Sequence, residues 1–287
     1  MATRKKRAVA RGRTTARVVI VGYGRIAGAL ATGLKRSGFR ISVLPRSAES
    51  VRRAAAARMT LADHEDLRAA QLCILAVPDA AVAPALELVE ADLGPSTAVI
   101  HCSGALPLSV FAAAKSKKRA FGSFHPLAAI SDPHDSLAGH TVALASTTKE
   151  LNALLHAMAK ALGMSTIDVP ETGRAPYHAG AVLSAGLLVS LLDGAVSALE
   201  EAGLDREEAL KALVPLSKSA LRGVEARGLE RGLTGPVVRG DVAVVQAHLE
   251  SLPAELGSLY RLLSRRALRL TPALPPETRL ALERLLA

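Results

Sequence analysis

The chain has 287 residues, which is long for one compact domain and sufficient for two domains that each bury a core. Hydrophobic residues make up 49% and charged residues 22%, with no Trp, so we expect a globular protein whose core consists mainly of Ala, Val and Leu. This composition excludes a disordered chain. The two Cys residues have the spacing of neither a metal site nor a disulfide framework, which favours a reducing compartment.

The net charge of +10 comes mainly from the first seventeen residues, which contain seven basic residues and no acidic one. Without those seven the net charge falls to +3, so we interpret residues 1–16 as a disordered basic leader. A tether to nucleic acid is the alternative, although the rest of the chain has no basic stripe with interleaved aromatic residues. We find no apolar run of roughly 18 residues and no secretory signal, so we expect no membrane span and a cytoplasmic protein.

The first half alternates β-branched runs with helical patterns, beginning with a strand, a Gly-rich turn and a helix between Arg17 and Gly38. The later strands are predicted within residues 39–47, 71–79, 97–105, 140–146 and 165–170, with helices within 47–59, 80–94 and 149–162. This alternation predicts an α/β domain with a doubly wound parallel sheet and helices on both faces.

The second half has a different pattern, with long helices predicted over residues 177–201, 205–226 and 241–265 and a short one from Pro276. We therefore expect an N-terminal sheet domain over residues 17–172 and an all-helical C-terminal domain over residues 173–287.

The turn GYGRIA, residues 22–27, follows the first predicted strand and opens the first predicted helix. Gly22 permits a tight turn, Gly24 lets the backbone approach a pyrophosphate, and Ala27 allows the helix to pack closely on the strand. The N-terminus of the helix presents unpaired N–H groups and the positive end of its dipole to phosphates. This context favours dinucleotide binding over a purely structural turn, with contacts from Gly22, Tyr23, Gly24, Arg25, Ile26 and Ala27.

The end of the second predicted strand indicates which nicotinamide cofactor is bound. An acidic residue there would hold the ribose 2′-hydroxyl of NAD, but the sequence has Leu44, followed by Arg46 and Ser47. A guanidinium and a hydroxyl suit a 2′-phosphate, and Arg52 and Arg53 follow in the next helix. We therefore predict NADP(H) rather than NAD(H); the alternative is that these arginines form a solvated helix face.

Candidate contacts to the reacting part of the ligand follow three other segments. Val77, Pro78 and Asp79 end a predicted strand where the nicotinamide half should lie, although Asp79 is equally well explained as a helix cap. Ser103, like its neighbour His101, and His125 follow successive strands at the same sheet edge. His178, at the start of the first long helix, could exchange a proton with a reacting oxygen or nitrogen. Structural histidines are the alternative.

The segment LTGPVVRGD, residues 233–241, interrupts the helical half. Gly235 and Pro236 end one helix, and Asp241 is predicted to accept N–H bonds at the N-cap of the next. A simple break between two helices explains neither Arg239 nor the position of His248, which comes seven residues after Asp241 on the same helical face. The sharper hypothesis is that Arg239 and Asp241 bind an anionic substrate.

In this order, GYGRIAGAL, VPD, HCSGAL, FHPL, PYHAGAV and LTGPVVRGDV resemble one family, the Rossmann-like oxidoreductases with a C-terminal helical domain of unknown function. That family is similar in plan to 6-phosphogluconate-dehydrogenase-like enzymes such as ketopantoate reductase, pyrroline-5-carboxylate reductase and prephenate dehydrogenase. The resemblance covers about residues 17–260. It implies a nicotinamide-dependent enzyme that is dimeric through its helical domain and binds substrate between the two domains.

One position departs from the family pattern. Relatives usually carry an Asn eight residues after the helix histidine, and this sequence has Gly186 there. If that Asn orients substrate, Ser184 or a water molecule must replace it, or the chemistry is altered or lost.

These observations predict an NADP(H)-dependent oxidoreductase that transfers a hydride to or from a small acidic keto, hydroxy or imine substrate. We expect His178 to relay the proton, His125 and Ser103 to contact the reacting group, and Arg239 to anchor the anion. Gly186 motivates an alternative, a non-catalytic NADP(H)-binding sensor or scaffold. The sequence does not specify the substrate, so ketopantoate is only a fold-level analogy.

Overall fold

The computed structural model describes residues 16–116 and 118–287, so the predicted basic leader lies outside the described residues except for Ala16. The chain divides into two compact units between Val182 and Leu183, which we call unit 1 and unit 2. This division falls inside helix α6 (Arg174–Ser184). The domain boundary predicted at residue 172 stays a prediction.

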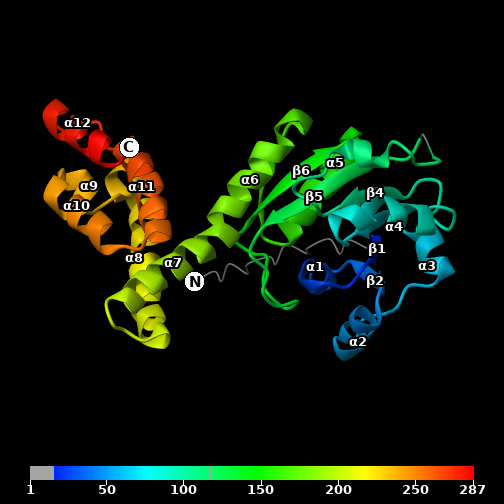
Figure 1. The fold of residues 1–287 in the computed structure, drawn as a ribbon. Coiled ribbons are helices and arrows are strands. Elements are labelled where there is room, and N and C mark those ends of the chain that lie inside the picture. The colour runs from blue at the N-terminus through cyan, green and yellow to red at the C-terminus, as the bar shows by residue number, and fades with distance from the viewer. Residues whose placement is uncertain (1–15, 117) are drawn as a thin grey trace, which may run out of the picture. The chain divides into compact units, whose positions relative to one another are not determined.

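Unit 1 is built on a seven-stranded sheet with the order β2-β1-β3-β4-β5-β6-β7 (Figure 1). Its strands are β1 (Arg17–Val21), β2 (Arg40–Leu44), β3 (Leu72–Leu75), β4 (Ala98–His101), β5 (Phe121–Leu127), β6 (Thr141–Ser146) and β7 (Ser165–Asp168). The predicted parallel sheet is confirmed for β1 to β5 and for the pair β6–β7. It is wrong for β5 and β6, which pair antiparallel because residues 128–140 return the chain without a crossover helix.

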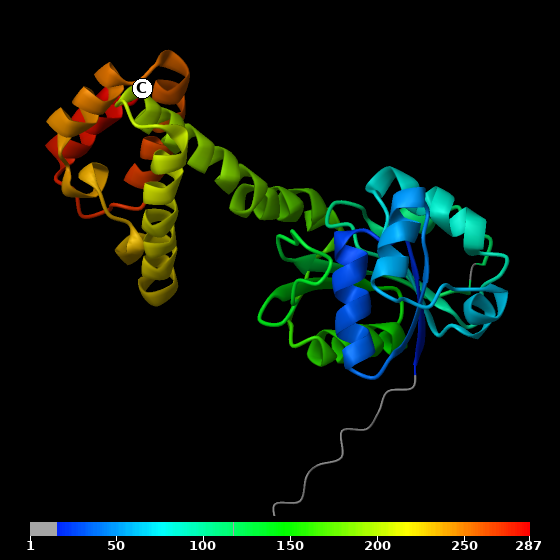
Figure 2. The ribbon, with the colours of Figure 1, turned by 90° about the horizontal axis from the view of Figure 1, so that it is seen from below.

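Helices cover both faces of the sheet, as the alternation predicted (Figure 2). One face packs against α1 (Arg25–Arg36), α2 (Ala48–Ala56) and α5 (Lys149–Ala161), and the other against α3 (His64–Ala69) and α4 (Val82–Val89). Three short 3₁₀ segments also belong to unit 1, η1 (Asp79–Ala81), η2 (Leu108–Phe111) and η3 (Glu171–Gly173). The central strands are buried on both sides, which explains their continuous apolar runs.

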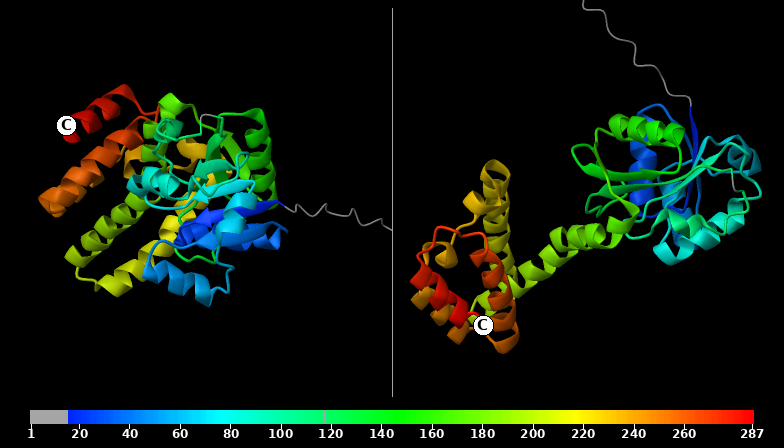
Figure 3. Two further views of the ribbon diagram at one scale, coloured as in Figure 1. Left: turned by 90° about the vertical axis from the view of Figure 1, so that its right-hand side faces the viewer. Right: turned by 90° about the horizontal axis from the view of Figure 1, so that it is seen from above.

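Unit 2 is helical throughout, which confirms the predicted all-helical region (Figure 3). Its helices are α7 (Gly186–Glu201), α8 (Arg206–Gly232), α9 (Pro236–Arg239), α10 (Val242–Ser251), α11 (Ala254–Leu268) and α12 (Pro276–Leu285). Two long predicted helices are each divided in two. Ala185 leaves helical geometry between α6 and α7, and Pro253, which has no N–H to continue a helix, separates α10 from α11.

The segment LTGPVVRGD forms the one-turn helix α9 between two glycines with positive φ, Gly235 and Gly240. A Cβ on Gly240 would lie 2.6 Å from Cγ2 of Thr278, so only glycine fits there. Asp241 is the N-cap residue of α10, but its side chain makes no capping hydrogen bond. The predicted capping by this carboxylate is therefore wrong, because it accepts a hydrogen bond from Arg239 instead.

One stretch, Glu171–Glu201, is long and apolar enough by length and composition to cross a membrane, with a mean hydropathy of 1.9. The expectation that no run reaches roughly 18 residues is therefore wrong, because residues 175–192 contain no Asp, Glu, Lys or Arg. A single such helix is weak evidence for a membrane span, although only 6% of its apolar window is buried. The predicted cytoplasmic location stays a prediction.

Candidate functional site

The turn between β1 and α1 has the backbone that its glycines require. Gly22 has a φ of +93°, and its N–H donates to the carbonyl oxygen of Leu44 at 2.8 Å. A Cβ on Gly22 would lie 2.5 Å from the carbonyl oxygen of Ala76, so a side chain there would displace the neighbouring strand end. Gly24 is the N-cap of α1, and a Cβ on it would meet no atom within 4 Å. No described protein atom therefore covers the N-terminus of α1 on the side where a Gly24 side chain would lie.

A groove of about 580 Å³ runs beside this turn, within the size range of ligand pockets. Its lining combines the start of α1, the end of β3 and the end of β4, the three segments singled out in the sequence. The residues are Gly24, Arg25, Ile26, Ala27, Arg53, Ala76, Val77, Pro78, Asp79, Cys102, Ser103, Ala128 and Ile130. The structure thus brings together most of the predicted cofactor contacts. Tyr23 is not among them, since it is buried in the core.

The predicted 2′-phosphate contacts follow β2. The Ser47 hydroxyl caps α2 by accepting the N–H of Ser50, while the Arg46 side chain is exposed. Arg53 lines the groove, and its Nη1 lies 3.0 Å from Oε1 of Glu49. Its Nε is buried without a hydrogen-bond partner, although 40% of the side chain is exposed. Arg53 therefore brings a partly exposed cation to the groove.

Ser103 connects the groove to a polar cluster on unit 1. Its Oγ accepts the N–H groups of Ala105 at 3.2 Å and Leu106 at 3.0 Å, which fixes the loop after β4. Because both bonds use the oxygen as acceptor, the hydroxyl proton remains free to donate. Ser103 also lines the groove, so this donor lies on the predicted ligand side.

A buried polar patch lies on the neighbouring strands β4 and β5. Ser123 and His125 lie on the same face of β5, because side chains alternate, and Ser123 pairs in register with His101. Arg174, the first residue of α6, is only 2% exposed, and its Nη2 donates to Ser123 Oγ at 2.5 Å. Its Nε lies 3.4 Å from Oε1 of Glu171, close enough for an ion pair but without a well-aligned hydrogen bond. A positive charge is thus buried beside His101 and His125.

His125 and His178 meet over Gly104. Their ring centroids are 6.0 Å apart, and Nδ1 of His125 lies 2.6 Å from the hydroxyl of Tyr177. A Cβ on Gly104 would lie 2.7 Å from Cε1 and 2.8 Å from Nε2 of His125, and 2.8 Å from Cδ2 of His178. Only glycine at position 104 leaves room for both imidazoles. The structure therefore brings the predicted residues Ser103, His125 and His178 together within unit 1.

Burial controls the protonation of this cluster. Burial, together with the charges of His178 and Arg174 and against an opposing contribution from Asp79, lowers the pKa of His125 to about 4. Burial, aided by Arg174, also lowers the pKa of His101 to about 4. Burial raises the pKa of the Tyr177 hydroxyl to about 12. At neutral pH the imidazoles of His101 and His125 are therefore neutral, and the Tyr177 phenol keeps its proton.

Arg239 and Asp241, predicted to bind substrate, lie in unit 2 and contact each other. Arg239 Nε donates to Asp241 Oδ2 at 2.7 Å, and the two side chains are 61% and 36% exposed. His248 forms a hydrogen bond with the Tyr260 hydroxyl. Gly186 is the first residue of α7, and a Cβ on it would meet no atom within 4 Å. The substrate-binding role of Arg239 and Asp241 stays a prediction.

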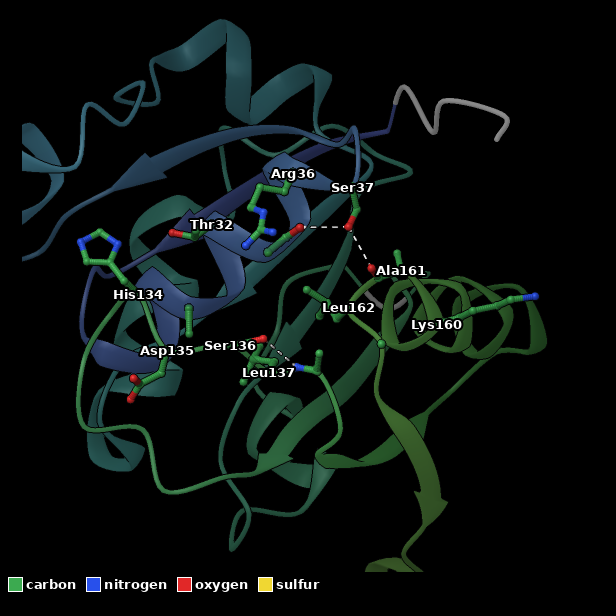
Figure 4. Close-up of a pocket in the computed structure, with 14 residues that line it drawn as sticks. Thr32, Arg36, Ser37, His134, Asp135, Ser136, Leu137, Lys160, Ala161 and Leu162 are labelled. Atoms are coloured by element: carbon green, nitrogen blue, oxygen red, sulfur yellow. Dashed lines mark hydrogen bonds between the residues drawn. The ribbon is translucent and has the colours of Figure 1, made fainter. Parts of the chain in front are cut away.

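A second hollow, of about 400 Å³, lies between the C-terminal ends of α1 and α5 and residues 134–138 (Figure 4). None of the predicted site residues lines it. Its cations, Arg36 and Lys160, lie in the last turns of the two helices, where they offset the negative ends of the helix dipoles. The Ser37 hydroxyl bridges to the carbonyl oxygen of Ala161 at 2.9 Å. Helix stabilisation accounts for these groups.

Sequence reasoning missed Arg174, Tyr177 and Gly104 as site residues and gave His101 only a minor place. Tyr177 lies in PYHAGAV and Gly104 in HCSGAL, two of the segments that carried the family resemblance. Their presence in those segments was the available signal. Arg174 had none, since its burial against Ser123 depends on the packing of η3 and α6 on β5.

Comparisons with known proteins agree with this architecture. Residues 17–104 match the family described as NADP oxidoreductase coenzyme F420-dependent, and residues 141–267 match DUF2520, a domain of unknown function. A candidate NADP oxidoreductase from Bacteroides fragilis is 26% identical, with a TM-score of 0.74 over 89% of this chain and 98% of that one. A search of curated proteins found no match.

Two further solved structures share the fold. A protein from Thermotoga maritima is 22% identical, with a TM-score of 0.70 over 88% of this chain and 98% of that one. The 1-pyrroline-5-carboxylate reductase from Streptococcus pyogenes is 18% identical, with a TM-score of 0.62 over 88% of this chain and 98% of that one. The chain therefore contains, in the order that its motifs predicted, a segment that matches an NADP oxidoreductase family and a segment that matches DUF2520.

Proposed function

We propose that the protein is an NADP(H)-dependent dehydrogenase or reductase that acts on a small acidic substrate with a keto, hydroxy or imine carbon. The observation that carries this proposal is the continuity of the groove with the histidine cluster. The groove begins at the bare N-terminus of α1 and ends at Ser103, and the next residue, Gly104, packs against both imidazoles. A cofactor in the groove would thus end beside groups that can donate or accept protons.

The groove fits a nicotinamide dinucleotide. The open space at Gly24 is the cradle that a pyrophosphate needs, and the free N–H groups of α1 face it. Arg53 of α2 supplies a partly buried cation to the groove. The last residue of β2 is Leu44, so no carboxylate stands at that position to hold a ribose 2′-hydroxyl. The nicotinamide, when bound, would supply the hydride, and the protein orients the substrate, moves the proton and excludes water.

NADPH should bind more tightly than NADH, and Arg53→Ala should remove most of that preference. A charge-assisted hydrogen bond to a phosphate is worth about 1.5–3 kcal/mol, so we expect about a 10- to 100-fold loss of NADPH affinity and little change for NADH. Fluorescence titration of the purified protein with each nucleotide measures both constants. Arg52→Ala is the matched control, since Arg52 lies on the same helix but does not line the groove. Binding of neither nucleotide would disprove the proposal.

The chemical roles follow from the cluster. His178 is assigned the proton relay, while His125 and the free Ser103 hydroxyl proton contact the reacting group. A non-catalytic NADP(H) sensor is the second candidate, and the observation that favours it is the empty space at Gly186. NADPH binding without turnover on any keto acid or imine would favour the sensor.

We also propose that the protein is a homodimer through its helical unit. Within unit 2 the helices α7 and α8 expose large apolar side chains, including Val189 at 68% and Leu216 at 64%, and burial of such side chains against a second copy would be favourable. Light scattering after size exclusion should give about twice the chain mass of 29.8 kDa. Val189→Glu should give the monomer mass. Leu280→Glu, at a 47% exposed position on α12, should leave the dimer intact. A monomeric wild type, or a protein recovered only with lipid vesicles, would contradict the dimer.

A further inference from the structure

The hydrogen bond between His125 and Tyr177 uses Nδ1 of the imidazole, so the direction of this bond determines which ring nitrogen carries the proton. The distance of 2.6 Å between Nδ1 and the Tyr177 oxygen is shorter than the usual N–H···O range of 2.7–3.2 Å and typical of an O–H donor. Among the described residues, Nδ1 is the one partner found for this hydroxyl. When the phenol donates its proton to Nδ1, the proton of the neutral ring resides on Nε2.

A second Tyr–His pair in the chain shows that such a contact need not impose the same assignment. His248 and Tyr260 meet with the same edge-on arrangement, with ring centroids 5.6 Å apart in both pairs. Their nitrogen–oxygen distance is 2.9 Å, within the N–H···O range, and the Tyr260 hydroxyl also interacts with the Ser264 side chain. This pair is exposed on unit 2 and serves as a matched control.

The Nε2 atom of His125 is directed at the reacting side of the cluster. It lies 2.8 Å from the position that a Cβ on Gly104 would occupy, and no hydrogen bond to it is found among the described residues. It is also not among the buried atoms that lack a partner, so it remains open to a ligand. In this tautomer His125 therefore offers an N–H donor beside Gly104, the residue that follows Ser103 of the groove lining.

The charges around His125 restrict which substrate group can bind to its Nε2–H donor. The charged or titratable groups acting on its ring are Arg174, Asp79 and His178, with Arg174 buried and positive. A protonated imine is both a cation and a donor, so it would meet a second donor close to a buried guanidinium. A carbonyl or hydroxyl oxygen accepts the N–H bond, and developing negative charge on it is favoured by Arg174.

We propose that Tyr177 is a positioning residue that holds His125 as a neutral Nε2–H donor, so that the substrate presents an oxygen acceptor there and not a protonated imine. The direction of the Tyr177–His125 hydrogen bond is part of this proposal, and the substrate class rests in addition on the proposed function. The site is thus matched to a neutral or negatively charged acceptor, such as the oxygen of a keto or hydroxy acid, and disfavours a cationic imine.

Nitrogen NMR of the ¹⁵N-histidine-labelled full-length protein at neutral pH tests the tautomer without any substrate. The His125 signals are identified by their loss in His125→Gln. We expect the wild type to carry the proton on Nε2 alone, and Tyr177→Phe to reveal an Nδ1–H form and lose the hydrogen-bonded hydroxyl signal. Tyr260→Phe should leave the His125 spectrum unchanged. A proton on Nδ1 in the wild type, or an unchanged spectrum in Tyr177→Phe, would overturn the role of Tyr177.

NADPH oxidation with pyruvate or ketopantoate, compared with 1-pyrroline-5-carboxylate, tests the substrate class. We expect turnover with a keto acid, and about a tenfold lower kcat in Tyr177→Phe with an unchanged KM for NADPH. Turnover of the cyclic imine alone would overturn the oxygen-acceptor assignment. Failure to bind NADPH would instead overturn the proposed function, while the NMR result would still decide the role of Tyr177.

Discussion

Gly24→Ala should weaken NADPH binding at least tenfold while lowering the free energy of unfolding by no more than about 1 kcal/mol, the cost of alanine at a helix N-cap. A Cβ at this position meets no protein atom within 4 Å, so the folded chain has room for it. The same methyl group would stand where a pyrophosphate must approach the backbone of the turn. The effect is therefore expected in the cofactor titration and hardly at all in thermal unfolding.

Gly22→Ala provides the contrast in the same turn. Its Cβ would lie 2.5 Å from the carbonyl oxygen of Ala76, and its φ of +93° is unfavourable for any residue with a side chain. We expect a loss of about 2–4 kcal/mol in the free energy of unfolding, visible as a lower Tm. If Gly24→Ala bound NADPH as well as the wild type, the dinucleotide would not approach this turn. Equal Tm losses in the two variants would mean that Gly24 is as crowded as Gly22.

The parts of the fold that could be predicted from the sequence are those set by local pattern. Four of the predicted strands became β1 to β4, whereas β5, which has no β-branched residue, was not predicted, and the turn at Gly22 has the positive φ that its position implied. The antiparallel return of β6 could not be predicted, because direction depends on how residues 128–140 cross the sheet edge. Helix α3 was also missed, since it is only six residues long and depends on the Asp63 side chain for its N-cap.

The candidate site likewise has residues that could be predicted from the sequence and residues that could not. Ser103 was predictable because residues after parallel strands gather at one sheet edge. His125 was predicted to follow a strand, which is wrong, because it lies within β5 and pairs with Ala143 of β6. The partners that determine their chemistry were not predictable, because they come from other elements. Arg174 reaches Ser123 from α6, and Tyr177 reaches His125 one helical turn later. Such contacts depend on the angle at which a helix packs on a sheet, and a single sequence does not encode that angle in any local pattern.

His178→Ala should lower turnover about 10²- to 10⁴-fold, the usual contribution of a positioned proton donor or acceptor, and leave NADPH affinity nearly unchanged. His178 does not line the groove, so its loss removes no cofactor contact. Its ring lies 6.0 Å from that of His125, and burial lowers the pKa of His125 to about 4. A neutral His125 can donate a hydrogen bond but carries no extra proton to release at pH 7. Within this cluster, we therefore propose His178 as the group that exchanges a proton with the substrate.

His140→Ala is the control for this prediction, because His140 is exposed and lies before β6, away from the cluster. Its turnover and NADPH affinity should equal those of the wild type. Gly104→Ala should reproduce the loss seen in His178→Ala, since its Cβ would press on both imidazoles at 2.7–2.8 Å. If His178→Ala turned over substrate at the wild-type rate while Gly104→Ala did not, the displaced His125 would be the essential ring. The proton would then have to come from water or from the Ser103 hydroxyl, the other free donor on the groove.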